Sequence, residues 1–307
     1  MKKKVDLSVT ISGLRLKNPV LTASGTFGYG EEYAPYLNLN TLGAIITKGI
    51  SLTPAPGNPP PRICETPAGM LNAIGLQNCG LNAFIAEKLP FLRTLSTALI
   101  VNFWGRTQRE YQEMAKRLSD LPDIGGLEMN ISCPNIKQGG ISFGSTAKDA
   151  FAVVSAVRKI ASLPLMVKLS PNVGDIGAIA ESVEEAGADA ISLINTLYGM
   201  AIDVETRRPR LGNVIGGLSG PAIKPVAVRM VFEVAQRVKI PVVGVGGIVS
   251  AEDALEFLIA GARAVQVGTA NFIQPDVTAK IVSGIEEYLI RHKMNTVDQI
   301  TGSIELP

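Results

Sequence analysis

Short runs of β-branched and other hydrophobic residues alternate along the chain with longer segments in which hydrophobic positions recur at helical spacing. Such alternation is typical of parallel β-strands connected by helices. The short runs predict eight strands, at residues 20–23, 44–47, 99–102, 127–131, 165–169, 190–194, 242–245 and 264–267. The amphipathic segments predict helices at residues 81–92, 108–118, 147–161, 176–186, 223–237, 251–260 and 277–292.

This order of elements predicts a (β/α)8 barrel, the TIM-barrel fold of the α/β class, formed by residues 1–307 as a single domain. Capping residues mark two of the helix starts. Asp175 precedes one helix, and Ser250 with Asp253 has the spacing of a capping box at another. With 307 residues, of which 46% are hydrophobic, the chain can bury one large core or two smaller ones. A doubly wound sheet is the main alternative.

Polar residues follow the predicted strands at their carboxyl ends, the face on which barrel enzymes build their sites. They are Ser24, Lys48, Asn102, Asn130 with Cys133, Lys168, and Asn195 with Thr196. Singly, each could be a strand-end residue with a structural hydrogen bond. Together they predict one site. Its two lysines favour an anionic or electron-rich ligand, because an ammonium ion stabilises charge that develops on a ring or a carboxylate.

Glycines end the last two predicted strands. Gly244, Gly246 and Gly247 end the seventh, and Gly268 with Thr269 ends the eighth. The corresponding loops of a barrel commonly hold a phosphate group through backbone N–H groups. Glycines of this kind can also serve only to make turns. Their occurrence at two adjacent strand ends nevertheless predicts a phosphate site and, with the lysines, a phosphate-bearing redox cofactor.

The segment Asn-Ile-Ser-Cys-Pro-Asn, residues 130–135, places the thiol of Cys133 where a strand gives way to a loop. The chain holds one histidine, His292, which lies between two basic residues and is predicted to be a surface residue. A base that acts near neutral pH is therefore a lysine, a carboxylate or a cysteine. Cys133 is the best-placed candidate.

A long excursion, residues 51–97, separates the second and third predicted strands. It begins with a proline-rich part and continues with a mixture of glycines and side-chain amides. Loops of this length in a compact domain are usually functional, so we expect it to lie over the site; a surface Ω-loop is the alternative. A second excursion, residues 197–220, carries arginines predicted to face solvent or a partner: Arg207, Arg208 and Arg210.

Charge and cysteine content argue against several classes of protein. The 29 basic and 27 acidic residues give a net charge of +2, which predicts neither nucleic-acid nor anionic-membrane binding. No stretch reaches the roughly 18 apolar residues of a membrane span, and no apolar segment typical of a signal peptide follows the basic run at residues 2–4. Cys64, Cys79 and Cys133 are widely spaced, which predicts no disulfide framework, no metal site and a cytoplasmic location.

On these motifs the chain resembles the dihydroorotate dehydrogenases, flavin enzymes of pyrimidine synthesis, over essentially its whole length. The most specific matches are residues 72–78, 130–135, 194–196 and 217–220 and the glycines at the last two strand ends. The cysteine at position 133 resembles the cysteine base of the class 1 enzymes. Residues 65–72 resemble the corresponding segment of subclass 1B, the NAD-dependent catalytic subunit. Two departures, Phe103-Trp104 beside a flavin-binding asparagine and Cys79 where proline is frequent, put local loop packing in question.

The resemblance implies one FMN per chain, bound across the mouth of the barrel. The residues implied to bind it are Ser24, Lys48, Gly49, Asn102, Asn130, Lys168, Ile194, Gly220, Gly246, Gly247, Gly268 and Thr269. Lys168 is implied to face the electron-accepting end of the ring, where a positive charge favours the reduced cofactor. The residues implied to hold dihydroorotate are Lys48, Asn72, Ala73, Ile74, Gly75, Leu76, Asn130, Asn195 and Thr196.

The implied reaction oxidises (S)-dihydroorotate to orotate. Cys133 removes a proton from C5 while a hydride passes from C6 to FMN. The subclass implies that electrons reach NAD+ through a partner subunit that carries FAD and an iron–sulfur cluster, bound to a homodimer of this chain. A fumarate-dependent class 1A enzyme is the alternative within the same fold. A phosphate-binding lyase or isomerase with Lys168 as a Schiff-base lysine, and a flavin-holding scaffold without catalysis, are further alternatives.

Overall fold

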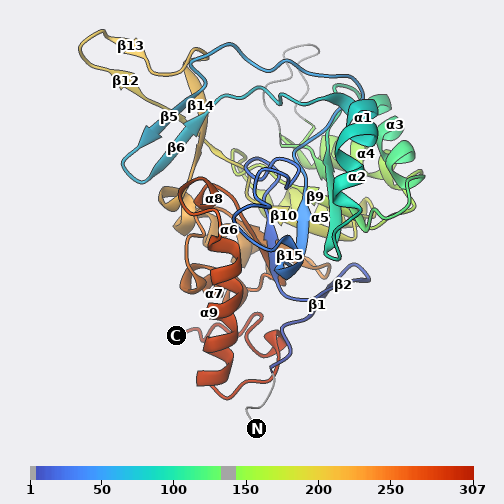
Figure 1. Ribbon diagram of the computed structural model, residues 1–307, viewed down its shortest axis with the longest axis vertical. Helices are drawn as coiled ribbons and strands as arrows, with labels where there is room; N and C mark the ends of the chain where they lie inside the picture. The colour runs from blue at the N-terminus through green and yellow to red at the C-terminus, as the bar shows by residue number, and fades with distance from the viewer. Residues whose placement is uncertain (1–4, 133–142) are drawn as a thin grey trace.

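A computed structural model describes residues 5–132 and 143–307, and in it eight parallel strands close into a barrel (Figure 1). The barrel strands are β3 (Val20–Thr22), β4 (Ala44–Ile46), β7 (Ala98–Phe103), β8 (Gly126–Asn130), β9 (Leu165–Lys168), β10 (Ala190–Leu193), β15 (Val242–Val245) and β16 (Ala264–Val267). Each pairs with the next in chain order, and β16 pairs with β3 to close the ring. The predicted (β/α)8 barrel is therefore confirmed.

Helices follow the barrel strands and lie around them (Figure 1). They are α3 (Gln108–Ser119), α4 (Ala147–Arg158), α5 (Ile176–Glu185), α6 (Lys224–Ala235), α7 (Ala251–Ile259) and α9 (Val277–Arg291), with a short α8 (Ala270–Ile273) after β16. The predicted caps are confirmed. The Asp175 side chain accepts a hydrogen bond from the backbone of Ala178, and Ser250 with Asp253 forms a capping box. The predicted helix at residues 81–92 is continuous but divided into α1 (Gly80–Ala83), a π-helical turn η2 (Phe84–Lys88) and α2 (Leu89–Leu92).

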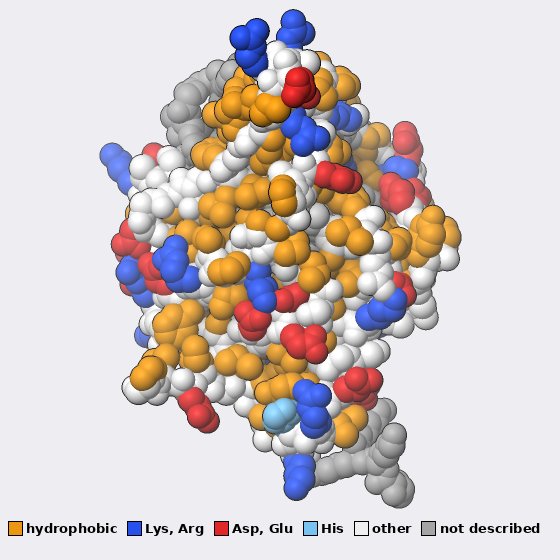
Figure 2. Space-filling model, turned by 90° about the vertical axis from the view of Figure 1, so that its left-hand side faces the viewer, with side chains coloured by type: hydrophobic (Ala, Val, Ile, Leu, Met, Phe, Trp, Pro, Cys, Tyr) orange, Lys and Arg blue, Asp and Glu red, His pale blue; other side chains and the backbone are white. Residues whose placement is uncertain are grey.

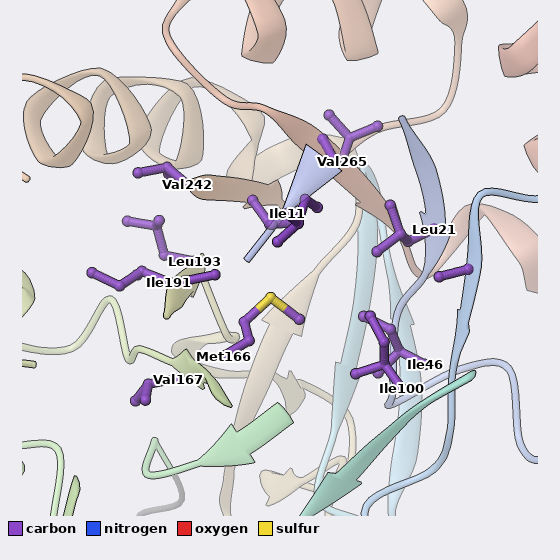
Figure 3. Packing of buried hydrophobic residues seen from close by; sticks show 14 of the residues in the cluster. Ile11, Leu21, Ile46, Ile100, Met166, Val167, Ile191, Leu193, Val242 and Val265 are labelled. Atoms are coloured by element: carbon purple, nitrogen blue, oxygen red, sulfur yellow. The ribbon is translucent and has the colours of Figure 1, made fainter. Parts of the chain in front are cut away.

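The core of the barrel is made by buried aliphatic side chains on its strands. Figure 3 shows Ile46 and Ile100, which are register partners on β4 and β7, with Leu21 of β3 close by. At the amino ends of the strands, an antiparallel hairpin of β1 (Val9–Ile11) and β2 (Leu14–Leu16) closes the barrel, and Ser12 in its turn donates a hydrogen bond to the carbonyl of Asp189, the residue before β10. The open end is therefore the carboxyl end of the strands.

A second, smaller sheet stands over the carboxyl end of the barrel. Its strands, in sheet order, are β11 (Leu197–Met200), β14 (Ile215–Ser219), β6 (Gly69–Asn72) and β5 (Ile63–Thr66). A two-stranded hairpin of β12 (Ile202–Asp203) and β13 (Arg208–Pro209) projects from it (Figure 1). The excursions 51–97 and 197–220 thus contain strands where the sequence indicated loops. The pairing that joins them, Gly217 with Asn72 for example, links residues too distant in the chain for local patterns to show.

The surface agrees with the small net charge. Figure 2 shows acidic and basic side chains scattered among hydrophobic ones over one face of the molecule. His292 is exposed, as predicted, and its ring stacks on Tyr288 with 4.1 Å between centroids. Arg207, Arg208 and Arg210 are also exposed. Within residues 5–132 and 143–307, no helix has both the length and the apolar character that a bilayer-crossing segment requires.

Candidate active site

A cavity of about 1080 Å³ opens at the carboxyl ends of the barrel strands, beneath the small sheet. Residues at the ends of all eight barrel strands line it, together with residues of the small sheet. Ligand sites in proteins commonly measure about 300–1,000 Å³. The cavity can therefore hold a large cofactor and a small substrate side by side.

Every sequence-predicted site residue in the described part of the chain lines this one cavity. On the barrel side these are Ser24, Lys48, Gly49, Asn102, Asn130, Lys168, Ile194, Asn195, Thr196, Gly220, Gly246, Gly247, Gly268 and Thr269. On the side of the small sheet they are Asn72, Ala73, Ile74, Gly75 and Leu76. Cys133 lies outside the described residues; Ser132, which precedes it, lines the cavity. The structure brings the predicted residues together, and their individual roles remain predictions.

The glycines after β15 form a narrow part of the cavity wall. Gly246 and Gly247 have φ angles of 131° and 75°, which side-chain-bearing residues rarely adopt. A Cβ on Gly247 would lie 2.8 Å from the backbone nitrogen of Lys224 and 2.9 Å from the carbonyl oxygen of Gly220. Opposite, the Thr269 hydroxyl donates to the Ser219 hydroxyl at 2.8 Å. Only glycine permits this close approach of backbone, as a phosphate cradle requires.

Two lysines supply positive charge to the cavity. The backbone N–H of Lys48, just after β4, donates to the Gly28 carbonyl at 2.7 Å. Burial lowers the pKa of the Lys48 ammonium, and the nearby positive charge of Arg62 lowers it further. Lys168, on β9, is 5% exposed, and its Nζ lies 3.4 Å from Oε1 of Gln266. Lys168 is therefore held where water is scarce, and Lys48 is half-buried, so their attraction for a negatively charged ligand is stronger there than in bulk solvent.

The chain that leads into Cys133 is fixed by hydrogen bonds up to Ser132. Oδ1 of Asn130 accepts from both the backbone N–H and the hydroxyl of Ser132, at 3.1 Å and 2.6 Å. The hydroxyl of Tyr111 donates to the Asn130 carbonyl at 2.7 Å, and Nδ2 of Asn195 donates to the Ser132 hydroxyl at 2.5 Å. The strand end that precedes the predicted base is thus anchored on two sides.

Side-chain amides line the side of the cavity that faces the small sheet. Nδ2 of Asn72, on β6, donates to the Gly217 carbonyl of β14 at 3.2 Å. Oδ1 of Asn195 accepts from the backbone N–H of Thr196 at 2.8 Å. In the barrel itself, Nδ2 of Asn102 donates to Glu128 at 2.6 Å, while its Oδ1 is buried and has no hydrogen-bond partner among the described residues. These amides offer both donors and acceptors to a polar ring.

Sequence reasoning missed several polar residues of the cavity wall. They are Arg62, Gln77, Ser132, Asn172, Asn213 and Ser219. Ser132 and Asn172 follow β8 and β9 within a few residues, so the strand-end rule could have found them. Ser219 lies in the matched motif 217–220, of which only Gly220 was assigned to the site, so that motif could have found it. Asn213 belongs to the second excursion outside that motif, and no local signal places it at the cavity.

The two departures from the family pattern are accommodated in the walls around the site. Phe103 is fully buried against Tyr111, with 6.1 Å between ring centroids, and Trp104 is buried with the Arg106 guanidinium 5.2 Å from its ring. Sγ of Cys79 lies 3.4 Å from the hydroxyl of Tyr29. Burial, reinforced by that thiol, raises the pKa of the Tyr29 hydroxyl. Phe103 and Trp104 at one place, and Cys79 at the other, therefore pack against neighbouring side chains.

Comparison with known proteins identifies the family. Residues 6–289 match the family model described as dihydroorotate dehydrogenase. This chain belongs to the dihydroorotate dehydrogenase family. It is 60% identical over 303 residues, 99% of each chain, to a protein of Geotalea daltonii named "Dihydroorotate dehydrogenase B (NAD(+)), catalytic subunit".

Two further relatives carry the same name. A protein of Geobacter metallireducens is 60% identical over 304 residues, 99% of this chain and 100% of its own. A protein of Thermoanaerobacter pseudethanolicus is 54% identical over 302 residues, 98% of this chain and 100% of its own. The resemblance inferred from the motifs is thereby confirmed for the dihydroorotate dehydrogenase family, and the names of these relatives agree with the inferred subclass.

Proposed function

We propose that this chain oxidises (S)-dihydroorotate to orotate, a step of de novo pyrimidine biosynthesis, with FMN as its bound cofactor. The observation that carries the proposal is that one cavity is lined by both lysines, by the side-chain amides and by Gly246, Gly247 and Gly268, which we call the glycine cradle. Membership of the dihydroorotate dehydrogenase family supports it. The cytoplasmic location predicted from cysteine usage stays a prediction.

The residues present fit FMN. Its phosphate would be held by Gly246, Gly247, Gly268 and Thr269, where Gly247 has no room for a Cβ. The unpartnered Oδ1 of Asn102 offers an acceptor to a ring N–H, and a buried acceptor that stays unpaired costs about 1–3 kcal/mol. When bound, FMN supplies a ring that accepts a hydride. Ser24, Lys48, Gly49, Asn130, Lys168, Ile194 and Gly220 complete the proposed binding set.

The substrate would lie against the amide-lined side of the cavity. Asn72, Asn130, Asn195 and Thr196 would pair with the ring, with residues 73–76 forming the wall beside it. Lys48 would contact the substrate carboxylate. Cys133, which follows the anchored Ser132, would remove the proton at C5. The pairing of a base at C5 with a hydride acceptor for C6 forms the double bond of orotate.

We further propose NAD+ as the final electron acceptor, reached through a partner subunit. The relatives are named as NAD(+)-type catalytic subunits, which supports a second subunit in those proteins. An iron–sulfur cluster takes about four cysteine ligands, and this chain has three cysteines, of which Cys133 is assigned to catalysis. We therefore propose that the partner carries FAD and the cluster and binds a homodimer of this chain. The same relatives do not favour the fumarate-dependent alternative.

Turnover by the isolated chain tests the proposed activity. The FMN-loaded chain, supplied with dihydroorotate and an artificial electron acceptor, is expected to form orotate continuously. Absence of orotate, together with trapping of a carbonyl substrate on Lys168 by borohydride, would support the lyase or isomerase alternative instead.

A substitution in the cradle tests the cofactor site. Gly268→Ala is expected to fold, because the nearest atom to the added Cβ is Ala23 Cβ at 3.5 Å. The methyl group would narrow the cavity beside the phosphate, so FMN affinity is expected to fall about tenfold, or about 1.4 kcal/mol. Titration of the apoprotein with FMN measures this. Gly174→Ala, where a Cβ meets nothing within 4 Å and which lies outside the cavity, is the control. Equal affinity in both variants would place the phosphate elsewhere.

A further inference from the structure

A layer of polar side chains crosses the interior of the barrel directly behind the cavity. Five strands contribute to it, and every member is 5% exposed or less: Asn102, Glu128, Lys168, Ser192 and Gln266. Glu128 is fully buried and makes contacts with the other four. A carboxylate is costly to bury unless it is paired and hydrogen-bonded. The neighbours of Glu128 must therefore stabilise its buried carboxylate.

Both carboxylate oxygens of Glu128 are used. Oε1 accepts from Nδ2 of Asn102 at 2.6 Å, and Oε2 accepts from the hydroxyl of Ser192 at 3.0 Å and from Nε2 of Gln266 at 2.5 Å. Nζ of Lys168 lies 3.9 Å from Oε1. Three neutral donors and one cation thus surround a single negative charge, and they come from strands on different sides of the barrel.

Two of these partners reach the cavity and Glu128 does not. Asn102 and Lys168 line the cavity, whereas Glu128, Ser192 and Gln266 lie behind them. Because an ionised carboxylate only accepts hydrogen bonds, Glu128 requires Asn102 to turn its NH₂ group inward. The Oδ1 of Asn102 then lies beside Gly49, where a Cβ would be only 2.6 Å away. The hydrogen bond from Nδ2 of Asn102 to Glu128 therefore leaves Oδ1 of Asn102, an acceptor, available to a ligand.

We propose that Glu128 is a positioning residue that sets how strongly the site favours reduced over oxidised FMN. It acts through two neighbours: it fixes the acceptor of Asn102 for a ring N–H, and its negative charge offsets the attraction of Lys168 for added electron density. This inference rests on the proposed function. A buried ion pair by itself is weak evidence of a contribution to stability, so a role in the site accounts for Glu128 better than a role in folding alone.

Glu128→Gln removes the negative charge and keeps the size of the side chain. The Lys168 cation then acts without its counter-charge, so the two-electron reduction potential of bound FMN is expected to rise. A tenfold change in the ratio of affinities for the two redox states corresponds to about 30 mV, and we expect a rise of about that size. It is measured without dihydroorotate at about pH 6, where lysine ordinarily holds its proton. The affinity of the apoprotein for oxidised FMN is expected to fall, because the new amide donor can turn Asn102 around.

Ser192→Ala is expected to shift the reduction potential of bound FMN in the opposite direction. It keeps the charge of Glu128 and removes one hydrogen-bond donor to it, so less of the negative charge is offset by its donors. The potential is expected to fall by about 10 mV, which corresponds to a twofold change in the ratio of affinities for the two redox states. The substitution deletes one hydroxyl and is expected to fold, which keeps the test valid if Glu128→Gln does not. Asp189→Asn is the control: it removes a carboxylate 2.6 Å from Arg158 at the opposite end of the barrel, and no shift is expected.

Shifts of opposite sign for Glu128→Gln and Ser192→Ala, with none for Asp189→Asn, support the proposal. A folded Glu128→Gln protein that is less stable but keeps the wild-type potential overturns it, since a purely structural residue behaves in that way. If Glu128→Gln fails to fold, an unchanged or raised potential in Ser192→Ala overturns it instead. Failure of the wild-type chain to bind FMN would contradict the proposed function itself and is seen before either variant is compared.

Discussion

Replacing Cys133 with alanine is expected to abolish dihydroorotate oxidation and leave FMN bound. Proton abstraction by a positioned base contributes about 10²–10⁴-fold to a rate, and no other residue is assigned that role. The proposed FMN contacts do not involve this thiol. The rate of FMN reduction by dihydroorotate, followed by stopped-flow absorbance, is expected to fall by that factor, while the flavin content of the purified protein stays the same.

Two further cysteine variants control this result. Cys64→Ala removes a buried thiol on β5 that does not line the cavity, and it is expected to keep the wild-type rate. Cys133→Ser is expected to be slow and to gain activity as the pH rises, because a hydroxyl is a much weaker acid than a thiol, whose free pKa is about 8.5. A Cys133→Ala protein that reduces its flavin at a near-normal rate would show that another group is the base.

NAD+ reduction is expected only when the partner subunit is present. Electrons that leave the cavity need a carrier, and three scattered cysteines cannot supply the four ligands that an iron–sulfur cluster generally takes. The isolated chain should therefore oxidise dihydroorotate with an artificial acceptor and form no NADH above background. A tagged chain purified from its native host should bring an iron-containing flavoprotein with it, and that complex should form NADH.

The choice of acceptor separates the subclasses. If the chain alone reduces NAD+ as fast as the complex does, the proposed partner has no role in electron transfer. If the chain alone reduces fumarate efficiently, the enzyme is of the 1A type, while the fold and the site are unaffected. Neither result would alter the expectation for Cys133→Ala, because the first half of the reaction ends with reduced FMN in every case.

The barrel could be predicted from the sequence because its strands are short buried runs separated by amphipathic helices. For β15 and β16 the predicted bounds agree with the structure, and each of the other barrel strands differs from its predicted bounds by one residue at one end or at both. The site followed from the same pattern. Since all parallel strands end on one face, polar residues at or just after the strand ends, such as Asn130 and Lys48, were expected to meet.

Features that depend on contacts across the fold could not be predicted. Strands β5 and β14 are short and rich in glycine or flanked by proline, and their sheet forms only because two excursions pair far from each other in the chain. Glu128 lies between two hydrophobic residues of β8, Leu127 and Met129, and no motif marks its partners. Its hydrogen bonds to Ser192 and Gln266 join strands well separated in sequence, so its place behind the site emerges only from the closed barrel.

Anaerobic mixing of the FMN-loaded chain with dihydroorotate tests the central claim most directly. We expect the visible absorption of the flavin to be lost after mixing, and orotate to form in an amount equal to that of the FMN reduced. Neither NAD+ nor a partner subunit is present in this experiment. Flavin absorption that stays unchanged under these conditions, with FMN demonstrably bound, would contradict the assignment of this chain as a dihydroorotate-oxidising enzyme.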